Sequence, residues 1–166
     1  QTAFTFVSQL RSWLPREIGG VLWFGNDDAN MVAYTPVYCG NTVQPACYNT
    51  KGADAVTFSS DNAFWLCNMV SNMVYPRYSQ LFPELKAVRD SLETSYFANQ
   101  TSIENQAADL YQTDKAAALK LLNNYSNTKA DEMLASWKHL ATRIIVKYND
   151  MAVKKEKDGK LLQSVT

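Results

Sequence analysis

The chain has 166 residues, of which 46% are hydrophobic and 19% charged, which is typical of one globular domain with a packed core. Lysine and arginine together number 16 and so do aspartate and glutamate, so the formal net charge is zero, which argues against nucleic acid or an anionic membrane as a partner. The apolar runs are too short for a segment to span a bilayer.

The first part of the chain, residues 1–58, has the sequence pattern of β-strands. Phe4, Phe6 and Leu10 lie at alternating positions and predict a strand over 2–10. The apolar run 21–24 predicts a buried strand over 20–25, ended by the turn formers Gly25 and Asn26. A polar turn is expected at 26–30, followed by an extended run at 31–39 and a short strand at 55–58.

The next part, residues 59–153, has the three- and four-residue apolar spacing of helices. Apolar positions from Ala63 to Val74 predict a helix that Pro76 ends or kinks, preceded by the capping residues 59–61. Pro83 is expected in the first turn of a long amphipathic helix over 84–111. Thr113 or Asp114 is predicted to cap a third helix, and residues 126–128 to cap a fourth. The charged tail 154–166 is expected to fray.

These elements predict an α+β domain: a small antiparallel sheet followed by a helical bundle. The strands over 2–10 and 20–25 are expected to pair antiparallel, and the helices to cover one face of the sheet. A strand pattern that begins at the first residue, with no targeting segment before it, suggests that residues 1–166 are one domain of a larger parent protein. We expect that protein to be soluble, and either cytoplasmic or exported.

The end of the predicted strand 20–25 is unusually rich in polar and aromatic residues. Asp27 and Asp28 are adjacent, so in an extended chain they point to opposite faces, which argues against an acid/base pair and against a carboxylate metal site. The same residues also form a good polar turn, since Asn, Asp and Gly favour turn conformations. Both interpretations, turn and binding site, remain open at this point.

The three cysteines and the single histidine are not spaced for metal binding or for a catalytic pair. Cys39 and Cys47 flank a turn-like loop, and are either reduced thiols or, in an exported protein, a disulfide. Cys67 lies among apolar helical positions and is expected in the core. No cofactor is expected.

Five segments, in order, carry a resemblance to a known family. They are "LRSWLP" at 10–15, "GGVLWFG" at 19–25, "YTPVY" at 34–38, "AFWLCN" at 63–68 and "RYS" at 77–79. Together they resemble the later part of the bacterial dipeptidase A family, cysteine peptidases of the N-terminal-nucleophile (Ntn) hydrolases with secernin-like relatives. The resemblance covers residues 4 to about 97, and it implies a hydrolase that cleaves dipeptides.

The resemblance implies a catalytic residue that this chain does not contain. In that family the nucleophile is a cysteine at the mature N-terminus, and its own α-amino group acts as the base. Residue 1 here is Gln1, so the nucleophile is expected upstream of it and this chain alone is expected to be inactive. The expected partners are the N-terminal catalytic part of the same parent chain and a dipeptide substrate.

The resemblance also implies an αββα sandwich, with substrate bound near the strand ends. We therefore expect a second sheet to cover the face of this one that lacks helices. That face should be apolar, in the Phe4/Phe6 or the Thr5/Val7 register, and the isolated chain is expected to form homo-oligomers through it. A dipeptide carries an amine and a carboxylate, and we expect Asp27 to meet the amine. The predicted substrate-binding residues are Trp23, Asn26, Asp27, Tyr34 and Tyr38.

Two other functions remain compatible with the sequence. One is a non-catalytic interaction module whose long helix at 84–111 presents a groove to a protein partner. The other is a small-ligand or glycan binder built on Trp23, Tyr34 and Tyr38. The sequence upstream of Gln1 discriminates between these and the peptidase, because only the peptidase requires an N-terminal cysteine.

Overall fold

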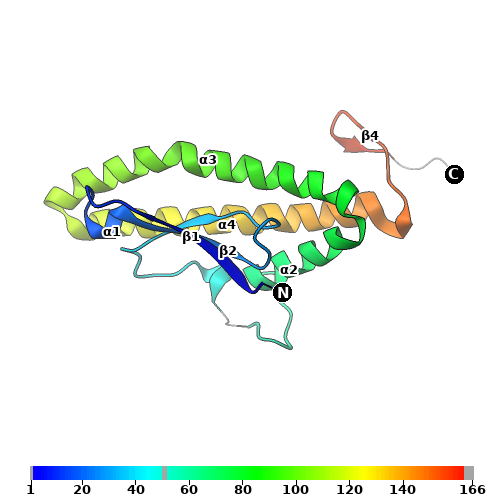
Figure 1. The fold of residues 1–166 in the computed structure, drawn as a ribbon, viewed down its shortest axis with the longest axis horizontal. Coiled ribbons are helices and arrows are strands. Elements are labelled where there is room, and N and C mark those ends of the chain that lie inside the picture. The colour runs from blue at the N-terminus through cyan, green and yellow to red at the C-terminus, as the bar shows by residue number, and fades with distance from the viewer. Residues whose placement is uncertain (1, 50–51, 163–166) are drawn as a thin grey trace.

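A computed structural model describes residues 2–49 and 52–162 and confirms the predicted α+β class. A small sheet comes first along the chain, and long helices follow. In Figure 1 the helices α3 and α4 run side by side along the length of the molecule, the sheet and α2 lie on one side of them, and a C-terminal hairpin projects at one end.

The sheet has three antiparallel strands in the order β1-β2-β3: Phe4–Leu10, Gly20–Asn26 and Thr35–Tyr38. Val7 pairs with Trp23, and Trp23 pairs in turn with Pro36 of β3. The predicted antiparallel pairing of the first two strands is confirmed. The extended run 31–39 is a strand only at Thr35–Tyr38, while residues 31–33 form a buried connection that pairs with no strand.

Four α-helices are described, the short α1 (Arg16–Gly19) and the longer α2 (Ala63–Val74), α3 (Tyr78–Thr113) and α4 (Lys115–Tyr148). Short 3-10 turns lie at Ala46–Tyr48, Tyr75–Arg77 and Asn149–Met151. Asp114 caps α4 as predicted, because its side chain accepts a hydrogen bond from the Ala117 backbone N–H at 2.9 Å. The cap of α2 is Asn62, one residue beyond the predicted 59–61, and it accepts from Trp65 N at 3.1 Å.

Two predicted helix starts are wrong. Pro83 lies inside α3, which already begins at Tyr78. The proline is tolerated because it and Ser79 are exposed, so water can satisfy the Ser79 carbonyl that the missing N–H leaves free. Residues 126–128 do not cap a new helix, since α4 runs through them without a break. Ser126 is fully buried, and neither Gly nor Pro interrupts the helix there.

The strand predicted at 55–58 is also wrong. The structure has only an isolated bridge between Asp54 and Thr57. The Asp54 carboxylate accepts the Val56 backbone N–H at 2.9 Å, which closes a tight turn. Val56 is 92% exposed, so its side chain meets no second layer that could hold an extended strand.

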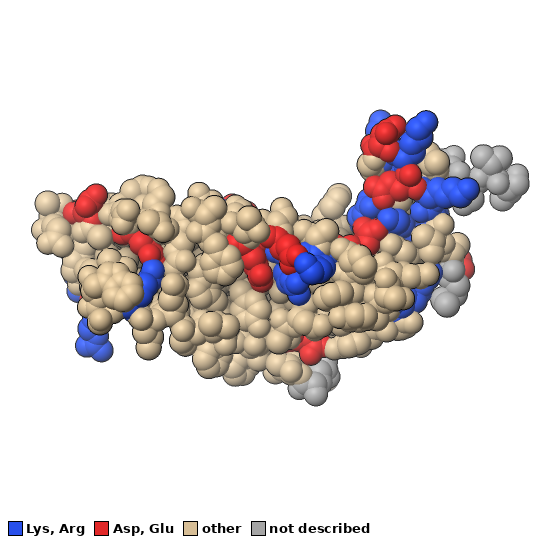
Figure 2. Space-filling model, turned by 45° about the horizontal axis from the view of Figure 1, so that its top comes forward, with Lys and Arg blue, Asp and Glu red and all other residues tan. Residues whose placement is uncertain are grey.

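Residues 156–161 of the C-terminal tail form a hairpin, contrary to the prediction that the tail frays; residues 163–166 lie outside the described part of the chain. Glu156–Lys157 (β4) and Lys160–Leu161 (β5) form a small hairpin. Its turn, Asp158-Gly159, has positive φ at both residues, which is the conformation that an Asp-Gly pair favours in a two-residue hairpin. Figure 2 shows charged side chains crowded on this hairpin, while most of the body visible in that view carries neither acids nor bases.

The two faces of the sheet differ in their cover. Val21 and Trp23 of β2 point to the helix face and are buried in a cluster with Tyr96 of α3 and Leu122 of α4. Phe4 and Phe6 of β1 point to the other face and are 56% and 53% exposed. We call this second surface the open face. Of the two registers considered, the structure has Phe4/Phe6 outward.

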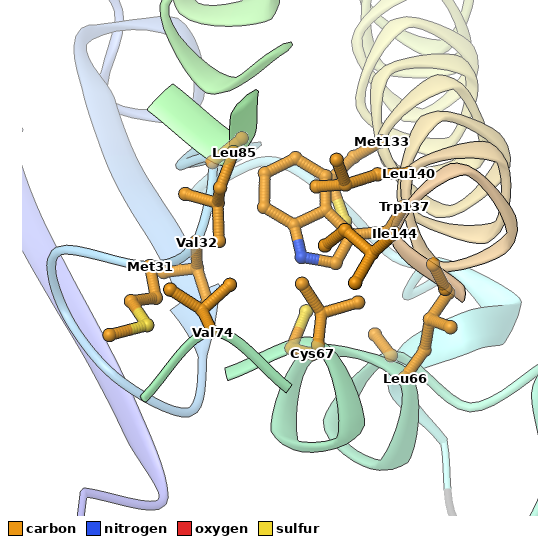
Figure 3. Packing of buried hydrophobic residues seen from close by; sticks show 14 of the residues in the cluster. Met31, Val32, Leu66, Cys67, Val74, Leu85, Met133, Trp137, Leu140 and Ile144 are labelled. Atoms are coloured by element: carbon orange, nitrogen blue, oxygen red, sulfur yellow. The ribbon is translucent and has the colours of Figure 1, made fainter. Parts of the chain in front are cut away.

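The larger core cluster lies where α2, α3 and α4 meet. Trp137 of α4 is fully buried at its centre, between Leu85 of α3 and Cys67 of α2 (Figure 3). The connection 31–33 closes one side of this cluster with Met31 and Val32. The core therefore ties the segment after β2 to the helices and fixes the position of the strand end.

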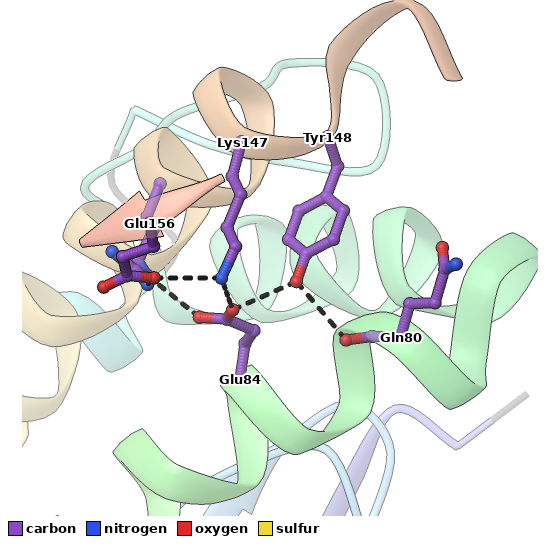
Figure 4. A network of polar contacts seen from close by, with 6 residues as sticks. Gln80, Glu84, Lys147, Tyr148 and Glu156 are labelled. Carbon is purple, nitrogen blue, oxygen red and sulfur yellow. Dashed lines mark hydrogen bonds and ion pairs between the residues drawn. The ribbon is translucent and has the colours of Figure 1, made fainter. Parts of the chain in front are cut away.

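A network of ion pairs joins the ends of the long helices to the hairpin. Glu84 of α3 binds Lys147, Arg143 and Tyr148 of α4, and Glu156 of β4 binds the same lysine and arginine (Figure 4). Burial alone would raise the pKa of Glu84, but the hydrogen bonds from Lys147, Arg143 and Tyr148 outweigh it and lower the pKa to about 2.

We expect this network to make stability depend on acidity. The pKa of Glu84 is lower in the folded chain than the ordinary value of 4.5. The ionised Glu84 therefore stabilises the fold fully above about pH 4.5, and this stabilisation is lost as the pH falls toward 2. The free energy of unfolding of the native chain should therefore fall more steeply between about pH 5 and pH 2 than that of Glu84→Gln. Urea denaturation across this range measures the difference. Asp109→Asn, an exposed carboxylate on the same helix, should keep the native slope; if Glu84→Gln also keeps it, the network does not stabilise the fold.

Candidate functional site

The polar strand end is held in a defined conformation. Asp27, the first residue after β2, has a positive φ of 72°, and its backbone N–H donates to the carbonyl of Ala3 at 2.9 Å. Gly25 leaves room for the returning chain, since a Cβ on it would lie 2.6 Å from Val32 Cγ2. Asp adopts positive φ more readily than most residues, which fits its place here. The predicted polar turn at 26–30 is therefore present and begins with an unusual backbone conformation.

Asp27 turns inward at this position. It is 1% exposed, and its Oδ1 accepts a hydrogen bond from Asn68 Nδ2 of α2 at 2.9 Å. Asn72, one turn further along α2, donates to the Asn68 carbonyl at 2.8 Å. The carboxylate thus fastens α2 to the strand end. That Asp27 also meets a substrate amine stays a prediction.

Asn26 faces a cavity of about 370 Å³ at the end of β2. The cavity is also lined by Tyr48, Asn62 and Trp65, and strand alternation places Asn26 on the same face of the sheet as Phe24. Asn26 Oδ1 is buried and accepts no hydrogen bond within the described residues. A buried amide oxygen without a donor is uncommon, and a ligand N–H is one group that would satisfy it.

Trp23 and Tyr34 line a different space on the helix face of the sheet. This cleft has a volume of about 420 Å³ and lies between β1 and α3, where Phe97 and Glu93 contribute to its wall. The Trp23 and Phe97 rings pack with centroids 4.6 Å apart, and Tyr34 hydroxyl and Thr5 Oγ1 are hydrogen-bonded at 3.1 Å. The structure therefore does not bring these two aromatic residues into the cavity that Asn26 lines.

Tyr38 lies in neither space. It is 2% exposed, and its hydroxyl donates to Glu104 Oε1 at 3.1 Å. Burial, together with the negative charge of Glu104, raises the pKa of Tyr38, so the phenol stays protonated at neutral pH. The predicted aromatic wall made of Trp23, Tyr34 and Tyr38 is thus divided between a cleft and the protein interior.

A buried polar network around Glu104 was missed from the sequence. Arg11 binds both carboxylate oxygens of Glu104, and Gln100 bridges Glu104 to Gln9 at 2.9 and 2.6 Å. Gln100 and Glu104 are four residues apart on α3, in line with Tyr96 on the buried side of the helix. The spacing of Gln100 and Glu104 at four-residue intervals after Tyr96 is the sequence signal that would have predicted this network.

The cysteines are free in this structure, so Cys39 and Cys47 are not bridged. Cys67 is buried in the core as predicted. Burial raises the pKa of Cys47 to about 12 and also raises that of Cys67, with nearby acidic groups adding to both shifts. Since the thiolate is the nucleophilic form, neither residue is poised for attack at neutral pH. Cys39 is exposed, next to Gly20.

Across residues 2–49 and 52–162, no three His, Cys, Asp or Glu side chains come together in a way that could hold a metal ion. Over the same ranges, no helix combines the length and the apolar character needed to cross a membrane.

The sequence that forms this α+β fold matches the model of a peptidase family. The model of Peptidase family C69 matches residues 1–91, more than half of the chain, and these residues contain the whole sheet and α2. The chain belongs to Peptidase family C69. The resemblance read from the five segments is thereby confirmed at the level of the family.

A curated relative agrees with this assignment. Probable dipeptidase B from Streptococcus pyogenes serotype M1 is 22% identical to this chain over 143 residues, which are 84% of this chain and 27% of that protein. The chain therefore spans about a quarter of the length of that relative. The match continues well beyond residue 91, so it includes helices that the family model does not reach.

Proposed function

We propose that this chain is part of a dipeptidase that cleaves dipeptides with an N-terminal cysteine nucleophile, as Ntn hydrolases do. Membership of Peptidase family C69 is the observation that carries the proposal. The curated relative is named a dipeptidase, and this chain corresponds to only 27% of it. The nucleophile would then come from a part of the protein outside residues 1–166.

The properties of the three cysteines support a nucleophile outside residues 1–166. Cys47 and Cys67 have raised pKa values, so they would form little thiolate at neutral pH. Cys39 is exposed, but within the described residues His139 is the only histidine, and no hydrogen bond joins the two. We therefore propose that the nucleophile of the enzyme is none of these three.

The open face supports the proposed sandwich. Phe4 and Phe6 are more than half exposed on it, and Leu22, Phe24 and Val37 are only partly covered. A second sheet packed at the usual distance of about 10 Å would bury such a face. The cavity lined by Asn26 opens at the strand end on this same side, where the proposed substrate would lie between strand ends and nucleophile.

Within that cavity we assign the contacts as follows. Asn26 Oδ1 accepts an N–H of the dipeptide, because it is buried and has no other donor among the described residues. Trp65 and Tyr48 supply apolar walls. Asp27, which Asn68 holds, is the carboxylate that we propose as the counter-charge of the substrate amine.

The test is dipeptide hydrolysis by the protein expressed from its complete reading frame. Asn26→Ala should raise the Michaelis constant about threefold to tenfold, the usual worth of one neutral hydrogen bond, with little change in stability. Asn30→Ala is the matched control, because Asn30 is an exposed amide in the same turn. Cys39→Ser, Cys47→Ser and Cys67→Ser should leave the rate of hydrolysis unchanged.

Two results would contradict the proposal. Loss of hydrolysis in Cys39→Ser would place the nucleophile inside this chain. A complete protein that hydrolyses no dipeptide would remove the peptidase function altogether. If Asn26→Ala and Asn30→Ala have equal kinetics, the cavity at the end of β2 is not the substrate site.

A further inference from the structure

The cleft between β1 and α3 has the composition of a ligand site, and it is separate from the cavity proposed for the substrate. It lies on the helix face of the sheet, whereas the Asn26 cavity lies at the strand end on the side of the open face. Its walls are Val7, Trp23, Phe97 and Tyr34, and its polar groups are Gln9, Gln100 and Glu93. Ser8 completes the lining.

The amides in this cleft already have partners. Gln9 Oε1 accepts from Trp23 Nε1 at 3.3 Å and from Gln100 Nε2 at 2.6 Å. Gln100 also donates to Glu104, which Arg11 neutralises. These bonds lock the orientation of the Trp23 ring and of both amides, so the cleft is formed before any ligand arrives.

In the part of the chain that the structure describes, Glu93 has no basic partner, unlike two other carboxylates of α3. Glu84 and Glu104 each bind a basic side chain, whereas within the described ranges Glu93 forms no ion pair. Its Oε1 accepts the Tyr34 backbone N–H at 3.0 Å, and no group of residues 2–49 or 52–162 donates to its Oε2. Among the described residues that line the cleft, Glu93 is the only one with an acidic carboxyl or a basic group.

The cleft therefore places the carboxyl group of Glu93 beside aromatic rings. Burial raises the pKa of Glu93, with the Tyr34 N–H and Arg89 acting in the opposite direction and Asp90 adding to the shift. A carboxylate in that environment gains from a cation, and an ammonium group near Trp23 and Phe97 also gains from the faces of the rings. Val7 and Phe97, which are 57% and 55% exposed, offer apolar surface to the remainder of such a ligand.

We propose that this cleft binds a protonated primary amine that carries an apolar or aromatic group, with Glu93 as the counter-charge and Trp23 and Phe97 as the apolar wall. Binding of the amine requires no peptidase activity, so this proposal can be tested independently of the proposed function. A neutral or anionic compound of the same shape should bind much more weakly, because it offers no cation to the Glu93 carboxyl group.

The probes are 2-phenylethylamine, the neutral 2-phenylethanol and the anionic phenylacetate, each titrated into the chain and followed by the tryptophan indole N–H signals in NMR spectra. The chain has four tryptophans, so four signals are expected, and Trp23→Phe identifies the one in the cleft. The amine should shift the Trp23 signal. The alcohol should bind about tenfold or more weakly, and phenylacetate should not bind measurably.

Glu93→Gln is the decisive variant, because glutamine keeps an oxygen that can accept the Tyr34 N–H and removes only the charge. It should weaken binding of the amine about tenfold or more. Asp109→Asn removes a charge from an exposed position of the same helix and should bind as the native chain does. Phe97→Ala, at a position that is 55% exposed, should also weaken binding of the amine.

The proposal is overturned if the amine leaves the Trp23 signal unmoved, or if the three probes bind equally well. It is also overturned if Glu93→Gln binds the amine as tightly as Asp109→Asn does. Should Glu93→Gln fail to fold, as judged by its circular dichroism, the comparison of charged and neutral probes together with Phe97→Ala still decides the outcome.

Discussion

Trp137→Ala is expected to destabilise the chain by about 3–5 kcal/mol. The indole is fully buried where α2, α3 and α4 meet, so its removal leaves a cavity among Leu85, Met133 and Cys67. Those neighbours belong to three different helices and cannot all move in to fill the space. Urea denaturation, monitored by circular dichroism, measures the loss.

Two further variants separate packing from other causes. Trp13→Ala is the matched control, since Trp13 is 77% exposed, and it should change stability by about 0.5 kcal/mol or less. Trp137 Nε1 has no hydrogen-bond partner within the described residues, so Trp137→Phe removes only part of the side-chain volume and no hydrogen bond. It should therefore lower the free energy of unfolding by less than Trp137→Ala does. Equal losses for Trp13→Ala and Trp137→Ala would mean that the core is not where the structure puts it.

Arg11→Ala is expected to cost a similar amount, about 3–5 kcal/mol, for an electrostatic reason. The side chains of Arg11 and Glu104 are only 10% and 7% exposed, so the substitution leaves a carboxylate buried without its counter-charge. Tyr38 and Gln100 still donate hydrogen bonds to that carboxylate, but neither carries a positive charge. Thermal or urea denaturation at neutral pH is the measurement.

The control for this prediction is an ion pair on the surface. Lys86→Ala removes a partner of Asp90 where the two side chains are 52% and 42% exposed, and it should cost about 1 kcal/mol or less. The double variant Arg11→Met, Glu104→Leu should recover much of the loss seen in Arg11→Ala, because no buried charge is then left unpaired. A double variant as unstable as the single one would show that the loss comes from packing.

The α+β class and the main elements could be predicted because local pattern determines them. Alternation over 4–10 and the three- and four-residue spacing over 63–74 are both visible in the sequence and correct in the structure. One error, at 126–128, arose where tertiary burial overrides local preference. Residues 126–128 are good capping residues, yet the core on either side of Ser126 continues the helix through them. At 158–159 the local sequence was sufficient, because an Asp-Gly pair by itself favours the hairpin turn that the structure has there.

The candidate site was predictable only in part. Strand alternation indicated that the end of β2 is special, but it could not show that Asp27 turns inward to Asn68 while Asn26 faces a cavity. Those directions depend on the positive φ of Asp27 and on α2, which lies about forty residues further along the sequence. Glu93 and Glu104 were missed because a partly buried acid on a long helix has the same sequence pattern as a solvated one.

Strand β1 also affects the tendency of the chain to aggregate. It lies at the edge of the sheet, and its sequence FTFVSQL has no charge and no proline. Such a segment is a template for cross-β stacking, and many proteins place a charged gatekeeper beside it. The nearest charged residue, Arg11, is committed to Glu104 in the interior. We therefore expect an uncovered β1 edge to make the isolated chain prone to cross-β association.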